Sequence, residues 1–399
     1  MNGVPRRIAM VAACPFPANY GSPAAIRELS ETLAEMGHDI HIVTYPYGED
    51  LPLGPAKLHR IKHGDSKRST HVGPSREKPW LDFLVLVELC RVIRREKIEI
   101  IHAHNYEGGL VGVAAKFLTW RPLIYNSVNL MADELHTYDF IKPAFLANWI
   151  ARALDWFVPI FPDHIIAVTQ ELYNWMIRRG VPARKLTMVP CGIKSEMFAG
   201  ADPEKFRNVY PIGTRPLVMY AGINSAFQRV DYLLRAFTVV LKEEPTAICM
   251  VLSPITGEPD LAANQALAKE LGIADSVIFA GPHTLDDLPH YLSMATVTVV
   301  SRPDCPGHPI KLLNYMMSAK PTVCFAGAAK GVRHMHDAWI VPDHDWQQMG
   351  AGIVALLRDP ELRRKLGENA RETAVQNFEW RSLCKKVVGI YDGLLAAKA

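Results

Sequence analysis

The chain has 399 residues, which is enough for two domains that each bury a hydrophobic core. Its composition, 49% hydrophobic and 21% charged, excludes a largely disordered protein. The net charge of +3 is close to neutral, so charge gives no reason to expect nucleic-acid binding.

The cysteines and the hydrophobic runs indicate the compartment. The seven cysteines are scattered and show no C-x-x-C spacing, which predicts reduced thiols and no zinc site. No hydrophobic run reaches the ~20 residues that a membrane-spanning helix needs. The first apolar stretch, Ile8–Ala13, is broken soon afterwards by Pro15 and Pro17, which favours a first β-strand over a signal peptide. We therefore expect a cytoplasmic protein.

A strand–turn–helix–strand unit opens the chain. Ile8–Ala13 is a continuous hydrophobic strand, as in a parallel sheet covered on both faces. A turn with Gly21 and Ser22 follows, then a helix over 24–36 and a strand over 41–45. At such a turn a glycine leaves room and free backbone N–H groups can bind a phosphate, so both turn residues are candidate ligands.

Residues 55–80 form a basic segment that we expect to be an irregular, solvated loop. Its cations are Lys57, Arg60, Lys62, Lys67, Arg68, Arg76 and Lys78. The alternative is a patch that docks on anionic lipid or on a phosphate-bearing acceptor.

The next strand ends in polar residues. A helix over 80–97 and a strand over 98–102 precede His104, which we expect to face a site at the carboxyl end of the strand. The residues expected on the acceptor side follow it directly: Asn105, Tyr106 and Glu107. The strand and exit at 122–130 bring Asn129 to the same edge.

Residues 131–162 are rich in aromatic side chains, including Trp149, Trp156 and Phe157. The pattern predicts a long helix packed in the core. The alternative is an amphipathic helix that lies on a surface and serves a lipid acceptor.

A second run of alternating strands and helices starts near residue 214, which predicts a second α/β domain. Its expected strands are 216–220, 247–254, 277–280, 296–300 and 322–325. Between the last two strands, the turn Pro303–Pro309 leads into a helix with one hydrophobic face. That face consists of Ile310, Leu313, Met316 and Met317.

A turn at a helix N-terminus favours an anion, because free N–H groups and the helix macrodipole point at it. The layout is typical of a site for a nucleotide or a sugar phosphate. The candidate ligands on this turn and helix are Gly307, His308, Lys311 and Asn314.

This stretch resembles the donor-sugar loop and helix of the GT-B glycosyltransferases of family 4 (group 1), which read "E-G-x-G-x-x-x-x-E-A-M-A-x-G-x-P-V-V". Ala319–Val323 matches the tail of that pattern, Met316 the helix methionine and Gly307 a loop glycine. The sequence I-H-A-H-N ending at Asn105 resembles the family's V-H-A-H, and F-E-W at 378–380 resembles its F-S-W.

The resemblance implies an α/β GT-B fold with two Rossmann-like, doubly wound parallel-sheet domains and a cleft between them. It implies an acceptor-binding domain over 1–195, a linker over 196–213 and a nucleotide-sugar-binding domain over 214–377. Residues 378–399 would form a helix that crosses back to the first domain.

The chain departs from the family pattern at the residues that usually carry the chemistry. The two glutamates of the E-x7-E signature fall on Pro306 and Asn314, and a family histidine falls on Val128. The diphosphate-binding Arg and Lys of the family fall on Ile223 and Gln228.

Other groups in the chain can take over these roles. Arg229 offers a guanidinium beside position 228, and Asp304 is the carboxylate near the missing first glutamate. Asp304, Asn129 and His104 are therefore the candidate catalytic residues.

The resemblance thus implies a retaining glycosyltransferase, with a UDP- or GDP-sugar as donor and no metal or other cofactor. The acceptor would be a glycan, a lipid-linked molecule or a small molecule, as in polysaccharide biosynthesis. A peripheral contact with the inner face of the membrane is compatible with this reading. Two alternatives stay open: a non-catalytic GT-B protein that binds a sugar nucleotide or supports an active partner, and another GT-B activity such as a sugar-nucleotide epimerase.

Overall fold

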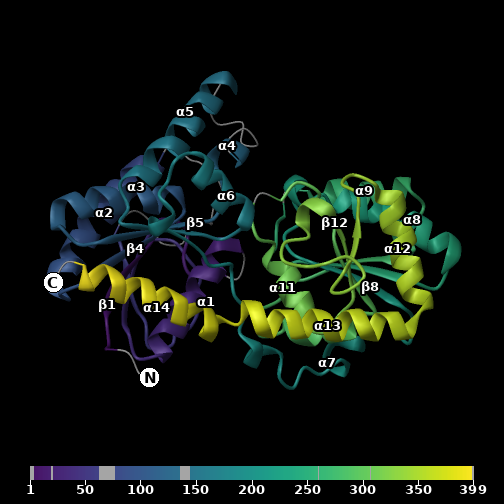
Figure 1. Ribbon diagram of the computed structural model, residues 1–399. Helices are drawn as coiled ribbons and strands as arrows, with labels where there is room; N and C mark the ends of the chain where they lie inside the picture. The colour runs from purple at the N-terminus through teal and green to yellow at the C-terminus, as the bar shows by residue number, and fades with distance from the viewer. Residues whose placement is uncertain are drawn as a thin grey trace. The chain divides into compact units, whose positions relative to one another are not determined.

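The computed structural model describes residues 4–18, 21–62, 77–134, 144–258, 260–305 and 307–397. The chain forms two compact units (Figure 1). Unit 1 comprises Met1–Gly192, Pro306–His308 and Trp380–Ala399, and unit 2 comprises Ile193–Cys305 and Pro309–Glu379.

Unit 1 is built on a seven-stranded parallel sheet with the order β3-β2-β1-β4-β5-β6-β7. The strands are β1 (Arg7–Ala12), β2 (Asp39–Thr44), β3 (Lys57–Arg60), β4 (Ile100–His104), β5 (Leu123–Ser127), β6 (His164–Ala167) and β7 (Leu186–Met188). The direction of winding reverses between β1 and β4, which is where a doubly wound sheet opens its ligand crevice.

Helices cover both faces of this sheet. The main helices of unit 1 are α1 (Gly21–Glu35), α2 (Lys78–Arg95), α3 (Asn105–Thr119), α4 (Met131–Glu134), α5 (Ala144–Phe157), α6 (Gln170–Arg178) and α14 (Trp380–Ala396). Alternate residues of β1 point to opposite faces. Ile8 and Met10 join a core made with α1 and α14, whereas Ala9 and Val11 join a core made with α2 and α3.

Unit 2 is built on a six-stranded parallel sheet with the order β10-β9-β8-β11-β12-β13. The strands are β8 (Leu217–Ala221), β9 (Ile248–Leu252), β10 (Val277–Ala280), β11 (Val297–Val300), β12 (Thr322–Phe325) and β13 (Trp339–Val341). Its helices are α7 (Glu204–Arg207), α8 (Val230–Glu243), α9 (Leu261–Glu270), α10 (Leu288–Met294), α11 (Ile310–Met317), α12 (Trp346–Arg358) and α13 (Pro360–Phe378).

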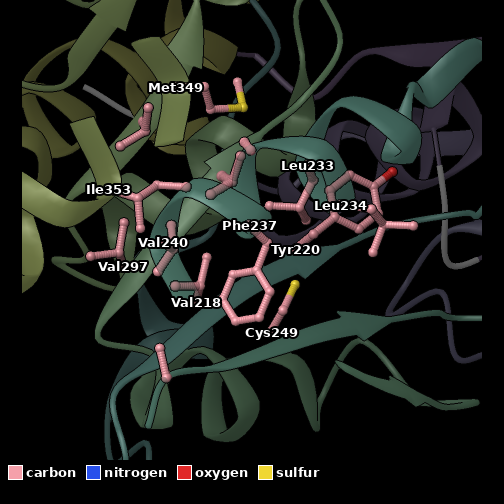
Figure 2. Packing of buried hydrophobic residues seen from close by; sticks show 14 of the residues in the cluster. Val218, Tyr220, Leu233, Leu234, Phe237, Val240, Cys249, Val297, Met349 and Ile353 are labelled. Atoms are coloured by element: carbon pink, nitrogen blue, oxygen red, sulfur yellow. The ribbon is translucent and has the colours of Figure 1, made fainter. Parts of the chain in front are cut away.

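The core of unit 2 lies between its sheet and the helices α8 and α12. Figure 2 shows Phe237 and Val240 of α8 beside Val218 and Cys249 of the sheet, with Ile353 of α12 close by. These side chains are almost fully buried. The helices thus pack firmly against the sheet, and the loops that follow the strands lie at its carboxyl edge.

The final helix, α14, belongs to unit 1 although it follows all of unit 2 in the sequence. Trp380 at its start donates a 2.7 Å hydrogen bond from Nε1 to Oε2 of Glu28 in α1. Near its end, the hydroxyl of Tyr391 lies 2.8 Å from Nδ1 of His102 in β4. Both contacts are buried, so α14 is an integral layer of this unit.

The predicted fold class is confirmed, with differences in detail. The segment expected to be an irregular loop over 55–80 contains the edge strand β3 and the start of α2, whereas residues 63–76 lie outside the described part. In the expected linker, a 3-10 turn at Ser195–Phe198 and α7 are ordered parts of unit 2. Among the described helices, none is long and apolar enough to cross a membrane.

Candidate functional site

The carboxyl edge of the sheet in unit 2 brings together the loop after β8 and the start of α11. The hydroxyl of Tyr315 in α11 accepts a 2.7 Å hydrogen bond from the backbone N–H of Ala221 at the end of β8. Ser301, directly after β11, donates a 3.1 Å hydrogen bond to the carbonyl of Gln228. The loop after β8 is therefore bonded both to α11 and to the residue that follows β11.

Lys311 lies in the first turn of α11 and points into the loop after β8. Its ammonium donates hydrogen bonds to the hydroxyl of Tyr220 at 2.6 Å and to Oε1 of Gln228 at 2.8 Å. It also lies over the ring of Tyr220, 3.9 Å from the centroid. The cation thus touches position 228, where the family pattern has its diphosphate-binding lysine.

The surroundings of Lys311 disfavour its charge. Burial, with a smaller contribution from the positive charge of Arg302, lowers the pKa of Lys311 to about 7. Gly222 has a φ of +152° and faces this side chain, and a Cβ built there would lie 2.7 Å from the lysine Nζ. A glycine is needed here both for the backbone conformation and for the close approach of the cation.

Arg229 is engaged within its own loop. It has a left-handed backbone, with a φ of 53°, and forms a bidentate pair with Asp231 at 2.8 and 2.9 Å. Its guanidinium also stacks on Tyr232. The partners compete with a phosphate for this cation, whereas the partners of Lys311 are neutral.

Asp304 is an exposed carboxylate at the same edge. Its Oδ2 lies 3.8 Å from Nε2 of His344, and that histidine contacts the hydroxyl of Tyr232. The neighbouring Arg302 stacks on Phe227 and donates to the backbone carbonyl of Asp304. The sequence did not single out Tyr220, Arg302 or His344 as site residues, because their contacts join separate loops.

The remaining donor-side candidates lie at helix starts. Asn314 follows Lys311 by one turn on α11 and is half-buried. Gly307 and His308 lie in the loop that precedes α11, are partly buried, and group with unit 1. Gly21 opens α1 in unit 1 with a φ of +55° and open space around it, and Ser22 follows it.

In unit 1, His104 ends β4 and is fully buried. Its Nδ1 lies 3.3 Å from Nδ2 of Asn126, and its Nε2 lies 3.4 Å from the sulfur of Met10. It stacks on His102 with centroids 4.4 Å apart. Burial lowers the pKa of His104 to about 3, so the ring is neutral at physiological pH.

The three acceptor-side candidates open α3 and have different surroundings. Tyr106 is buried and donates a short hydrogen bond to Asp155. Glu107 is partly buried and pairs with Lys78 at 2.6 Å. Asn105 is half-buried, with a φ of 60°, and Asn129, also half-buried, lies just after β5.

A carboxyl that the sequence did not single out lies near this pair. Asp82 of α2 accepts a 2.6 Å hydrogen bond from the hydroxyl of Tyr45. Burial raises the pKa of Asp82 to about 6, and the negative charge of Glu107 adds to the shift. Lys78, Glu107 and Asp82 therefore lie close together at the carboxyl edge of unit 1.

Within the part of the chain that the structure describes, no three His, Cys, Asp or Glu side chains gather as a metal-binding group.

Two family models together match most of the chain. The model described as Glycosyltransferase Family 4 matches residues 21–196, and the model described as Glycosyl transferases group 1 matches residues 202–373. The first match corresponds closely to the first segment of unit 1, and the second match lies almost entirely in unit 2.

Curated relatives align over nearly the full length. The D-inositol 3-phosphate glycosyltransferase of Acidothermus cellulolyticus is 26% identical, over 99% of this chain and 92% of the relative. The N-acetyl-alpha-D-glucosaminyl L-malate synthase of Bacillus anthracis is 22% identical, over 95% of this chain and 96% of the relative.

Solved structures share the fold. Sucrose-phosphate synthase from Thermosynechococcus elongatus superposes with a TM-score of 0.79 at 20% identity, covering 98% of this chain and 100% of that one. Anabaena HepE in complex with UDP-glucose gives a TM-score of 0.74 at 14% identity, covering 97% and 99%.

Proposed function

Because the chain belongs to the group 1 glycosyltransferases of family 4, which are retaining enzymes that use nucleotide-sugar donors, we propose that it transfers a sugar from a UDP- or GDP-sugar without a metal ion. We propose a glycan, a lipid-linked molecule or a small molecule as its acceptor, and the cytoplasm as its compartment, with a peripheral contact at the inner face of the membrane.

The observation that carries the proposal is the position of Lys311. Its ammonium donates a 2.8 Å hydrogen bond to the side chain of Gln228. Gly222 lies beside it and has no side chain that would block the ammonium. The departing nucleoside diphosphate gains negative charge in the transition state, and a fixed cation at a helix start stabilises that charge. Lys311 would thus supply from α11 the charge that the family pattern places at position 228.

The other donor-side residues fit the same role. Gly307, His308 and Asn314 would line the approach to the start of α11, with Asn314 hydrogen-bonded to a ribose hydroxyl. As the resemblance implies, we also propose that the backbone N–H groups of Gly21 and Ser22 bind the diphosphate. Arg229 would bind a phosphate only after breaking its ion pair with Asp231. We therefore propose that it contributes less to the free energy of donor binding than Lys311 does.

For the transferred sugar we keep Asp304 and Asn129 as candidate catalytic residues, because each carries a polar side chain at the carboxyl edge of its own sheet. His104 is neutral and buried. We therefore propose that it acts indirectly, by orienting Asn126.

On the acceptor side, Asn105, Tyr106 and Glu107 would contribute unequally. Asn105 and Glu107 would meet the acceptor together with Lys78, and Tyr106 would hold the loop after β5 through Asp155. The relatives' names mention inositol 3-phosphate and L-malate, two anionic small molecules, which supports a role for Lys78.

The test is a thermal-shift panel of UDP-, GDP- and dTDP-sugars with wild type, Lys311→Met and Lys365→Met. Lys365 is an exposed lysine of α13 and serves as the matched control. We expect one nucleotide class to raise the melting temperature of wild type and Lys365→Met but not of Lys311→Met. An unchanged shift in Lys311→Met would remove this lysine from the donor site.

Catalysis is checked separately by measuring nucleoside diphosphate released from the binding donor, with and without EDTA. We expect slow release that EDTA does not reduce and that Lys311→Met abolishes. Conversion of one sugar nucleotide into another without this release would instead indicate an epimerase, and binding without release would indicate a non-catalytic protein.

A further inference from the structure

Helix α5 of unit 1 turns its aromatic side chains outward. Phe145 is 73% exposed, Trp149 is 68% exposed and Trp156 is 59% exposed. With Arg152, which is also exposed, they follow one another at intervals of three and four residues, so they form one stripe along the helix. The sequence-based expectation of a helix packed in the core is therefore wrong for these tryptophans.

A buried flank of α5, about 100° around the helix from the stripe, holds the helix in place through a polar group. Asp155 is buried and accepts hydrogen bonds from the backbone N–H groups of Met131 at 2.8 Å and Ala132 at 3.0 Å, as well as from Tyr106. These bonds fix the rotation of the helix about its axis. The aromatic stripe cannot turn inward without breaking them.

The first half of α5 extends past the carboxyl edge of the sheet. Asp155 lies level with that edge, because it contacts Tyr106 just after β4 and Met131 just after β5. After Asp155 the chain runs back along the sheet to Asp163. The backbone N–H of Asp163 donates a hydrogen bond to the carbonyl of Leu123 at the start of β5. Phe145 lies ten positions before Asp155, which is about 15 Å along the helix axis, and Figure 1 shows α5 running out from the strands of unit 1.

The exposed apolar surface continues from α5 onto the end of α3. Phe157 and Phe117 both contact the ring of Phe161, with centroids 4.8 and 5.7 Å apart. Both are about half exposed, and Trp120 after α3 is 82% exposed. We call the exposed residues of α5 and this extension the aromatic face. Its aromatic content and the ring contacts that connect its parts mark an interaction surface and not scattered exposed side chains.

The charges on the aromatic face select the occupant. Arg152 lies within the stripe and Arg121 follows Trp120, and both are exposed. The sequence of α5 contains one acidic residue, Asp155, and it is buried. Exposed tryptophans with nearby arginines, on a helix without exposed carboxylates, fit the interface of a bilayer that contains anionic lipids. In a two-fold pairing of α5 with a second copy, the stripe would bring the two copies of Arg152 toward each other, which is unfavourable.

We propose that α5 docks the protein on a bilayer containing anionic lipids, with Phe145 and Trp149 inserted between the lipid headgroups. Because Asn105 and Glu107 lie at the edge from which α5 projects, docking holds the acceptor side of unit 1 at the lipid surface. If the protein is a glycosyltransferase, as proposed above, docking makes a lipid-linked molecule the favoured class of acceptor, and this part of the inference rests on the proposed function. The docking on the bilayer does not depend on the proposed function.

The test is co-sedimentation of the full chain with vesicles of phosphatidylcholine, alone or with about 30 mol% phosphatidylglycerol. The variants are Phe145→Ser with Trp149→Ser, and the control Val209→Ser with Val375→Ser. The control pair lies on unit 2, with Val209 64% and Val375 46% exposed. We expect wild type and control to sediment with the anionic vesicles, and the α5 variant to lose about tenfold in partitioning for each aromatic removed. Arg152→Gln should reduce binding about fivefold, and only to the anionic vesicles.

Three outcomes overturn the proposal: wild type that stays in the supernatant, an α5 variant that sediments as well as the control, or a lipid-independent dimer that only the α5 variant breaks. The nucleotide thermal shift is measured on the same samples. Vesicle binding without any nucleotide shift would leave the docking intact and contradict the proposed function, so the two failures are distinguishable.

Discussion

At the scale of single residues, Lys311 shows how a binding group costs stability. In the unfolded chain a lysine is protonated below pH ~10.4, whereas burial in the folded protein lowers the pKa of Lys311 to about 7. Between these values the unfolded state binds more protons, so this lysine makes stability rise with pH. The cost is largest at and below pH 7, where the folded protein must hold a poorly solvated ammonium.

We therefore predict that Lys311→Met is more stable than wild type, and that the difference is larger at pH 6 than at pH 9. Urea unfolding of both proteins at the two pH values measures this. Lys365→Met, which changes an exposed lysine, should show no such dependence. A difference that stays constant with pH would mean that the pKa of Lys311 is not lowered.

Donor binding should show the opposite dependence on pH. A diphosphate favours the charged ammonium, so its binding raises the pKa of Lys311 and takes up a proton above pH 7. We predict that affinity for the nucleoside diphosphate falls about tenfold per pH unit above pH 7, until the pKa of the complex is reached. Calorimetric titrations at pH 8 in two buffers of different ionisation enthalpy measure the proton uptake, which Lys311→Met should abolish.

Gly222 gives a second residue-scale prediction. An added methyl group would meet the lysine ammonium at 2.7 Å, and a φ of +152° is unfavourable for alanine. Gly222→Ala should cost about 1–3 kcal/mol of stability and weaken nucleotide binding by displacing Lys311. Gly257→Ala is the control, because its φ is also positive but nothing lies within 4 Å of the added atom. Equal nucleotide affinity in the two variants would contradict this account.

The places of the donor-side candidates in the fold could be read from the sequence, but the partners of their side chains could not. The helix-start position of Lys311 was visible in the turn that precedes it. Its contact with Gln228 joins positions 83 apart and depends on β8 and β11 being neighbours, which no local pattern reveals. For the same reason the burial of His104 could not be read from its motif. The pairing of Arg229 with Asp231 is local, but it accompanies a left-handed backbone at Arg229 that the sequence did not indicate.

At the scale of elements, hydrophobic periodicity found most strands and helices to within a few residues. The expected strand Thr322–Phe325 and the observed β12 coincide, and the helix expected over 80–97 is observed as α2 at Lys78–Arg95. Two elements were misread. β3 is a four-residue edge strand with little hydrophobic signal, and α5 has the periodicity of a core helix but presents that face outward. Periodicity finds a face but does not say what covers it.

The packing of α14 on unit 1 supplies the element-scale prediction. Tyr391→Phe removes the 2.8 Å hydrogen bond to Nδ1 of the buried His102. Leaving a buried polar atom without its partner costs about 1–3 kcal/mol, so the urea midpoint should fall while the slope m stays constant. Tyr173→Phe on α6, where the ring is half-buried, should stay within about 0.5 kcal/mol of wild type. If Tyr391→Phe also changed the free energy of unfolding by less than about 0.5 kcal/mol, the hydrogen bond to His102 would contribute little to stability.

At the scale of the whole molecule, each unit has its own hydrophobic cores and can respond separately to a ligand. The proposed donor site lies mainly on unit 2. A nucleotide at 100 times its Kd adds about 2.7 kcal/mol of stability. We predict that hydrogen exchange measured with bound nucleotide slows most at the end of β8 and the start of α11. Slowing confined to the strands of unit 1 would place the donor elsewhere.

The return of α14 to unit 1 also sets an order for biosynthesis. Trp380, Leu383 and Tyr391 belong to the same core as the first strand, yet the ribosome adds them after every residue of unit 2. Unit 1 therefore cannot close its core until all of unit 2 has been made, whereas unit 2 by then has all of its own strands and helices. The nascent chain should complete its folding in the reverse of the order in which domains usually fold, and until then the exposed face of the first sheet is a surface for a chaperone.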